Sequence, residues 1–188
     1  MVVLVHAPSC DIILWAREHR SRTRAEREVR NRRQKETLVK NGRAHGVIVY
    51  ANREPVGWCQ YGPREELPRI DHSRNYRGLA PTGEKEKLWR ITCFVVDKNY
   101  RKGGVASTAL KAVLEGIRNK GGGLVEAIPV SKTDQGPGYM YTGTVSMFQK
   151  AGFKTVGPFG TGRTTTVVMP RNYLNCWPVW AFISFSIS

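Results

Sequence analysis

The sequence lacks the patterns that hold metals and nucleotides. Its 188 residues include four cysteines and four histidines. Cys10, Cys59, Cys93 and Cys176 lie far apart, with neither a C-x-x-C pair nor a Cys/His cluster, which argues against a zinc site. G-x-x-x-x-G-K-[ST] and G-x-G-x-x-G are both missing, which argues against P-loop chemistry and a Rossmann dinucleotide site. We therefore predict no metal cofactor.

Recognisable export and membrane segments are also missing. The first five residues are apolar, but no basic region precedes them and Pro8 and Asp11 follow closely, so we expect no signal peptide. Residues 171–188 are too short for the ~20 apolar residues of a transmembrane helix, and Pro178 interrupts them. We expect this apolar tail to be a terminal extension, with no membrane partner. Cys59 and Cys93 fall in predicted strands as free thiols, which favours a reducing cytoplasm.

Acidic residues are scarce relative to basic ones. Fifteen Asp and Glu face 30 Lys and Arg, giving a formal net charge of +15 and attraction to polyanions. Residues 17–40 are a polar run without Gly or Pro, which predicts a long helix. This helix is either a nucleic-acid-binding arm or a solvated surface helix packed on a sheet. Glutamates interleave with its arginines, so we favour the surface helix and keep nucleic acid as the less favoured partner.

The remaining chain alternates strand and helix patterns. Residues 62–87 are rich in Pro and Gly, which predicts an irregular loop, and we place it over the acceptor side. A strand–helix–strand crossover over 88–130 should be right-handed and parallel. The expected elements are strands at 46–51, 55–61, 88–96, 124–130, 153–159 and 164–169, with helices at 105–119 and 142–151.

The stretch from residue 97 to residue 106, Asp-Lys-Asn-Tyr-Arg-Lys-Gly-Gly-Val-Ala, is typical of an anion site. It joins an apolar strand to an amphipathic helix, and a helix start leaves backbone N–H groups unpaired with partial positive charge. Gly103 and Gly104 allow close approach to the backbone, and Arg101 and Lys102 add cations. These features predict a phosphate cradle.

Two short motifs resemble those of the GNAT superfamily of acyl-CoA N-acyltransferases. The first is Arg101-x-x-Gly104-x-Ala106 after a strand, and the second is Phe148 followed by Gly152-Phe153, one helix and one strand later. The resemblance covers residues 46–169. It implies an α/β fold with a mixed, mostly antiparallel sheet, a central parallel strand pair and flanking helices. We accordingly divide the chain into an atypical N-terminal segment with a basic helix (1–45), an acetyl-CoA-binding domain (46–170) and the tail (171–188).

The resemblance implies where acetyl-CoA lies. The backbone of Phe94, Val95 and Val96 lines the pantetheine arm and the thioester, which slots between parallel strands that splay apart. The coenzyme A pyrophosphate is held by backbone amides. These belong to Arg101, Lys102, Gly103, Gly104, Val105 and Ala106, with Ser107 close behind.

The implied reaction is direct attack of an amine on the acetyl thioester. The tetrahedral oxyanion needs a hydrogen-bond donor, for which an amide near Val96 is suited, and the leaving thiolate benefits from an acid. The family's usual acid is a tyrosine, but Phe148 stands at that position and cannot transfer a proton. Tyr141, or alternatively Tyr139, is our candidate acid.

The attacking amine must also lose a proton, so a general base is expected. Glu126 on the second parallel strand is our candidate, with Glu65 and Glu66 in the loop as alternatives. His72 lies in the same polar loop, where solvation is the commoner fate of a histidine.

We thus predict an N-acetyltransferase whose acceptor amine, on a small molecule or a protein, is not specified, and which could form a homodimer. Two alternatives stay open at this point. One is a non-catalytic nucleic-acid-binding or interaction module that uses the basic helix. The other is a coenzyme A-binding member of the family without turnover, because of Phe148.

Overall fold

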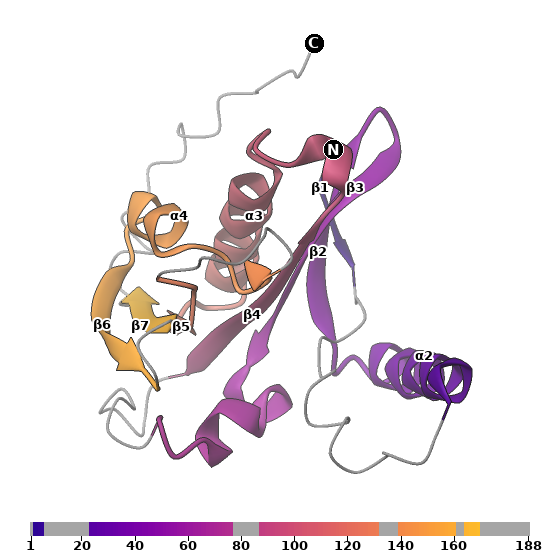
Figure 1. Cartoon of the computed structure of the whole chain (residues 1–188), viewed down its shortest axis with the longest axis horizontal. Coiled ribbons are helices and arrows are strands. Elements are labelled where there is room, and N and C mark those ends of the chain that lie inside the picture. Colours follow the sequence, from indigo (N-terminus) through magenta and orange to yellow (C-terminus); the bar gives the residue numbers. More distant parts are fainter. Residues whose placement is uncertain (1, 6–22, 77–86, 132–138, 161–163, 170–188) are drawn as a thin grey trace.

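The computed structural model of the protein describes residues 2–5, 23–76, 87–131, 139–160 and 164–169. Within these ranges seven strands form one sheet in the order β1-β2-β3-β4-β5-β7-β6. Neighbouring strands are antiparallel except β4 and β5, which are parallel. The helix α3 lies across one face of the sheet (Figure 1). The predicted mostly antiparallel sheet with a central parallel pair and flanking helices is confirmed.

The elements follow the predicted order along the chain. The strands are β1 Val2–Val5, β2 His45–Ala51, β3 Glu54–Pro63, β4 Leu88–Val96, β5 Leu124–Ala127, β6 Lys154–Phe159 and β7 Thr164–Met169. The α-helices are α2 Arg24–Lys40, α3 Val105–Asn119 and α4 Val145–Lys150, and the 3-10 helices are η1 Arg64–Glu66, η2 Pro68–His72 and η3 Lys98–Tyr100. No helix in the part of the chain that the structure describes is long and apolar enough to cross a membrane.

The polar helix α2 begins at a capping box. Thr23 accepts a hydrogen bond from the Glu26 amide at 3.3 Å, and the Glu26 carboxylate accepts one from the Thr23 amide at 2.9 Å. These bonds satisfy two amides that a helix start leaves unpaired. Val29 is 53% exposed, and α2 makes no extensive contact with any other described helix or strand. The exposure of α2 agrees with a solvated helix, but the predicted packing on the sheet is not seen among the described residues 24–40. Residues 17–22 lie outside the described ranges.

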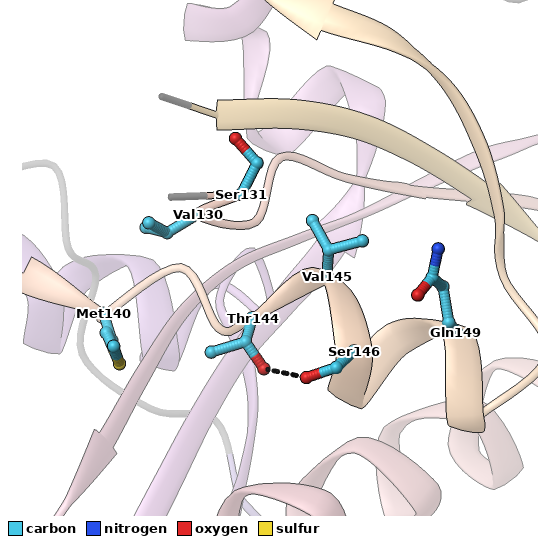
Figure 2. Close-up of a pocket in the computed structure, with 7 residues that line it drawn as sticks. All are labelled: Val130, Ser131, Met140, Thr144, Val145, Ser146 and Gln149. Carbon is cyan, nitrogen blue, oxygen red and sulfur yellow. Dashed lines mark hydrogen bonds between the residues drawn. The ribbon is translucent and has the colours of Figure 1, made fainter. Parts of the chain in front are cut away.

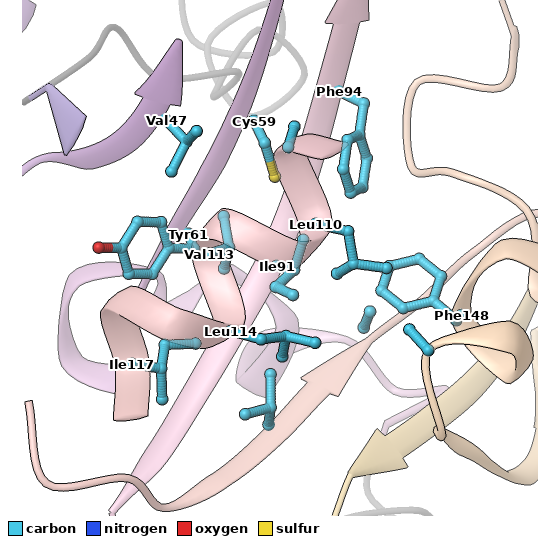
Figure 3. Close-up of a cluster of buried hydrophobic side chains, with 14 of the residues drawn as sticks. Val47, Cys59, Tyr61, Ile91, Phe94, Leu110, Val113, Leu114, Ile117 and Phe148 are labelled. Atoms are coloured by element: carbon cyan, nitrogen blue, oxygen red, sulfur yellow. The ribbon is translucent and has the colours of Figure 1, made fainter. Parts of the chain in front are cut away.

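The core lies between α3 and the sheet. Leu110, Val113, Leu114 and Ile117 recur at helical spacing on one face of α3, and all four are buried. Figure 3 shows them facing side chains of β2, β3 and β4, with Phe148 of α4 closing one end of the cluster. Full burial of an aliphatic side chain contributes about 1.5–3 kcal/mol, so this face anchors α3 firmly.

Three expectations need correction. The strand expected over 124–130 ends at Ala127, and Val130 forms only an isolated parallel bridge with Thr144. The helix expected from residue 142 begins at Val145, because the Thr144 hydroxyl accepts a hydrogen bond from the Met147 amide and caps the helix there. Cys59 is a buried free thiol as expected, but Cys93 is disulfide-bonded. The apolar tail lies outside the described residues.

Candidate active site

The parallel strands β4 and β5 separate halfway along β4. Their pairing runs from Leu88 opposite Leu124 to Ile91 opposite Ala127 and then stops. At the same level the β3–β4 register shifts, leaving Thr92 as an extra residue in β4. Such a β-bulge bends its strand and increases its local twist. The last residues of β4 therefore run on without β5 beside them, as the resemblance implied for the donor arm.

The amides of this free edge point away from β3. The Phe94 amide donates to the Tyr141 carbonyl at 2.6 Å, whereas the Asp97 amide donates to the β3 residue Val56 at 2.9 Å. Because strand amides alternate in direction, the Val96 amide points to the same side as that of Phe94. Both amides are therefore oriented toward the position predicted for the thioester. The Val95 side chain is 53% exposed.

The cradle follows directly after β4. The Asp97 carboxylate accepts from the Asn99 amide at 2.8 Å and starts η3, and Gly104 then enters α3 with φ of 79°. Only from Thr108, which donates to the Gly104 carbonyl at 2.9 Å, do the helical hydrogen bonds begin. In the described ranges, no group accepts a hydrogen bond from the amides of residues 105–107. These are unpaired donors of a helix start.

Space and charge at the cradle suit an anion. A Cβ built on Gly104 would meet no heavy atom within 4 Å, so the backbone there is open to a ligand. Arg101 and Lys102 are exposed beside it, and Lys102 itself takes a positive φ of 64°. The Gly103 amide differs from its neighbours, because it already donates to the Tyr100 carbonyl at 3.3 Å. Pairing with a ligand thus falls mainly to the amides after Gly103.

Glu126, the candidate base, lies in a buried ion-pair cluster. Its side chain is fully buried, and it accepts from Arg90 Nε at 2.5 Å and from the Tyr76 hydroxyl at 2.7 Å. Arg90 is equally buried and also donates to both oxygens of Asp71, each at 2.7 Å, and to the Leu67 carbonyl. Both carboxylate oxygens of Glu126 are engaged, which favours a structural role over proton transfer.

The pKa shifts in this cluster follow from its contacts. Burial disfavours the charge on Arg90, but hydrogen bonds to Asp71 and Glu126 outweigh it and raise the pKa of Arg90. The hydrogen bond from Arg90 holds the pKa of Asp71 below its ordinary value despite partial burial. Burial, together with the hydrogen bond to Glu126, raises the pKa of Tyr76 to about 12. All three groups therefore keep their pairing charges or protons at neutral pH.

The candidate acids occupy different environments. Phe148 is fully buried, and its ring centroid lies 4.9 Å from that of Phe153 and 6.1 Å from that of Phe94, so it is a core residue. Tyr141 precedes α4 rather than lying on it, is 42% exposed, and contacts β4 through its carbonyl. Tyr139 is 59% exposed. Tyr141 is thus the tyrosine that the structure brings beside the free edge of β4.

The alternative bases lie on η1 and η2. The Glu66 carboxylate and His45 Nδ1 form a hydrogen bond of 2.7 Å, and both side chains are mostly buried. Glu65 and His72 are exposed. None of Glu65, Glu66 and His72 is shown in contact with the part of β4 that extends beyond β5. Arg90 was missed by sequence reasoning, although a single arginine inside an apolar strand, opposite the lone glutamate of the next strand, is a detectable signal.

A pocket of about 430 Å³ lies between the residues after β5 and the start of α4. Figure 2 shows Val130 and Ser131 on one side and Thr144, Ser146 and Gln149 on the other. Met140 also lines this pocket. The pocket therefore lies next to Tyr141, the residue whose carbonyl contacts β4. No group of three or more His, Cys, Asp or Glu in the described ranges is arranged to hold a metal ion.

Comparison with known proteins agrees with this geometry. The chain is similar to an acetyltransferase from Thermus thermophilus, at 17% identity and a TM-score of 0.50, over 90% of this chain and 97% of that one. It is also similar to a ribosomal-protein-alanine N-acetyltransferase from Brucella melitensis, at 16% identity and a TM-score of 0.50, over 89% and 99%. These likenesses show the fold. None of the curated proteins compared by sequence matches the chain.

The sequence also matches one protein family directly. The match, to the acetyltransferase (GNAT) family, spans residues 11–138 and therefore more than half of the chain. It includes β4, the cradle and α3, and confirms at the level of the family the prediction of an acyl-CoA-dependent N-acyltransferase. The protein belongs to the acetyltransferase (GNAT) family.

Proposed function

We propose that the protein transfers an acetyl group from acetyl-CoA to an amine by direct attack of the amine on the thioester. One observation carries the proposal. The part of β4 beyond the end of β5, with the amides of Phe94 and Val96 aimed away from β3, leads into the start of α3, where the amides of residues 105–107 have no partner among the described residues. A ligand with an amide-rich arm and a pyrophosphate matches that sequence of donors.

The cradle accounts for the phosphate end of the donor. The unpaired amides and the positive end of α3 favour the pyrophosphate oxygens, and Arg101 and Lys102 add mobile charge. Gly104 leaves room for the phosphates to approach. The pantetheine arm then runs along β4 beside Val96 and Phe94, pairing with the strand edge as another strand would.

At the reacting end, the neutral amine nitrogen attacks the thioester carbon, its surplus proton passes to solvent water, and the C–S bond breaks as the tetrahedral intermediate collapses. The amide of Phe94 or Val96 donates to the oxyanion, which is the step that gains most from a fixed donor. Tyr141 is the proposed acid that protonates the departing thiolate. We do not carry Glu126 forward as the base, because Arg90 and Tyr76 engage both of its oxygens.

Two measurements test the proposal. Saturating acetyl-CoA should raise the melting temperature, because binding at about 100 times the dissociation constant adds about 2.7 kcal/mol. Free-thiol release should then appear with some members of a panel of amines covering small molecules and peptides. An unchanged melting temperature contradicts donor binding. A shift without thiol release from any amine instead favours the alternative of coenzyme A binding without turnover.

Several finer expectations stay predictions. The class of acceptor amine and a homodimer rest on the sequence alone. The cytoplasmic location loses part of its argument, because Cys93 is disulfide-bonded and only Cys59 is a free thiol among the described residues. Nucleic acid is the less favoured partner, because α2 mixes Glu26, Glu28 and Glu36 into its basic residues. A salt-dependent affinity for RNA or DNA in the absence of coenzyme A affinity would reverse this preference.

A further inference from the structure

The free edge of β4 is covered by a short segment of the chain itself. Residues 139–143, here called the strap, contact β4 on one side and Val130 on the other. The Phe94 amide donates to the Tyr141 carbonyl at 2.6 Å, and the Val130 amide donates to the Gly143 carbonyl at 3.0 Å. The strap thus fills with its own backbone the gap that opens where β5 ends.

We propose that the strap and the thioester of acetyl-CoA compete for the Phe94 amide, so that donor binding releases residues 139–142 from β4. The inference rests on the proposed function, because it takes the thioester carbonyl to lie along this edge. A single N–H group makes one well-aligned hydrogen bond, and that bond weakens steeply when the N–H is bent away from its acceptor. The Tyr141 carbonyl and the thioester carbonyl therefore exclude each other.

The strap is weakly held before Gly143. Tyr139, Met140 and Tyr141 expose 59%, 38% and 42% of their surface, so their side chains bury little. The bond from Phe94 and a turn in which the Gly143 amide donates to the Met140 carbonyl at 2.9 Å are its backbone contacts in the described ranges. Few buried contacts and exposed hydrogen bonds are the marks of a segment that opens locally at low cost.

An unsatisfied hydroxyl makes the closed strap less stable still. Thr142 Oγ1 is buried and has no hydrogen-bond partner among the residues that the structure describes. A buried polar group without a partner carries a desolvation penalty, which release into water removes. The closed arrangement is therefore one that a competing ligand can displace.

The far end of the strap is fixed, which makes Gly143 a pivot. Gly143 has φ of 81°, and a Cβ there would lie 2.8 Å from Met147 Cε and 3.0 Å from Phe148 Cε2. Close packing against α4 holds this end while the residues before it move. Met140 lines the pocket in Figure 2, which offers space on that side. After release, Tyr141 remains tethered beside the thioester.

Hydrogen exchange with two ligands tests the competition. Acetyl-CoA carries the thioester carbonyl and coenzyme A does not, so the pair is matched except for the competing group. We expect acetyl-CoA to speed exchange of the Gly143 amide, because its bond to the Met140 carbonyl breaks when residues 139–142 move, while slowing exchange at residues 104–108. Coenzyme A should slow exchange at 104–108 and leave the strap unchanged.

A variant sharpens the test. Thr142→Val removes the unsatisfied hydroxyl while keeping the shape, so it should stabilise the closed strap. We expect the dissociation constant of acetyl-CoA to rise on the order of fivefold and that of coenzyme A to stay the same. Thr155→Val, at an exposed position of β6, is the control and should change neither constant.

The outcomes separate this inference from the proposed function. If acetyl-CoA raises the melting temperature but protects the strap or leaves it unchanged, the competition is overturned and donor binding stands. Equal release by coenzyme A also overturns it, because no carbonyl is then required. If neither ligand raises the melting temperature, the proposed function fails and the inference with it.

Discussion

Two polar clusters along β4 show opposite states of satisfaction. In the middle of the strand, Arg90 meets Glu126 and Asp71, and every one of these charges has a partner. Just past the end of the strand, the amides of residues 105–107 have none within the described ranges. Arg90 and Glu126 are fully buried, whereas residues 101–104, which lead into these amides, are exposed.

The difference separates structure from binding. Buried charges persist only when they are paired, so a fully paired cluster has nothing left to offer a ligand. Unpaired donors at an exposed helix start cost little in water and are available to an anion. We therefore expect changes in the Arg90 cluster to act on stability, and changes in the cradle to act on donor binding.

The largest effect on stability should come from Arg90→Met. It leaves Asp71 and Glu126 without their shared cation, and breaking one side of a buried ion pair costs about 3–5 kcal/mol. Chemical denaturation measures the change. Arg64→Met is the matched control, because Arg64 contacts the same Asp71 at 2.8 Å with 47% of its side chain exposed, and such pairs contribute about 0–1 kcal/mol. Equal losses in the two variants would contradict the comparison.

The largest effect on binding should come from Gly104→Glu. It places a side chain and a negative charge where the pyrophosphate is expected, so acetyl-CoA affinity should fall by at least about 30-fold. Gly121→Glu is the control, since Gly121 also has a positive φ, of 92°, and open space around its Cβ position. Both variants should lose about 1–2 kcal/mol of stability from the left-handed backbone. Titration calorimetry decides, and equal affinity in the two variants would refute the cradle.

Glu126→Gln distinguishes support from catalysis. The amide side chain keeps the shape but loses the charge facing Arg90, which should lower the free energy of unfolding by about 1–3 kcal/mol. Acetyl-CoA affinity should be unchanged. Glu115→Gln, at a half-exposed position near Arg118, should stay within about 0.5 kcal/mol of wild type. A large loss of turnover without a loss of stability would restore Glu126 as the base.

The smallest predicted effect concerns Tyr76 at high pH. Its pKa is raised from 10 to about 12, so the stability that it contributes is complete below pH 10 and is lost as the pH rises from 10 to 12. Tyr76→Phe should lower stability at pH 8 by about 1 kcal/mol, because Glu126 loses a donor. The variant should then lose less than wild type between pH 10 and 12. Parallel alkaline unfolding curves would contradict this.

The sequence predicted the fold well where the pattern is local. The helix over 105–119 and the strands over 88–96 and 164–169 match residue for residue. The hydrophobic pattern marks all three segments, and Gly104 marks where the helix begins. The end of β5 at Ala127 was missed, because the residues after it leave the sheet and Val130 pairs instead with Gly143 and Thr144. That contact joins residues more than ten positions apart and leaves no local signal.

The site was predictable in part for the same reason. Backbone amides at a helix start follow from the glycine turn, so the cradle could be drawn from sequence. The state of Glu126 could not, because its partners Arg90 and Tyr76 come from distant segments and only packing brings them together. Likewise, no sequence pattern in residues 139–143 predicts that the Tyr141 carbonyl accepts a hydrogen bond from the Phe94 amide of β4.

The extra residue at Thr92 has a consequence for how this site is encoded. Thr92 has no partner in β3, so β4 has one residue more than β3 at this point. Because of this extra residue, the side chains on either side of Thr92 point to their present faces of the sheet. Deleting Thr92 would turn Phe94 from the core toward solvent and reverse the amides that follow, whereas replacing it with another residue would not. The orientation of the β4 residues after Thr92 therefore depends on the number of residues in β4. Insertions and deletions in this strand should disturb the site more than substitutions do.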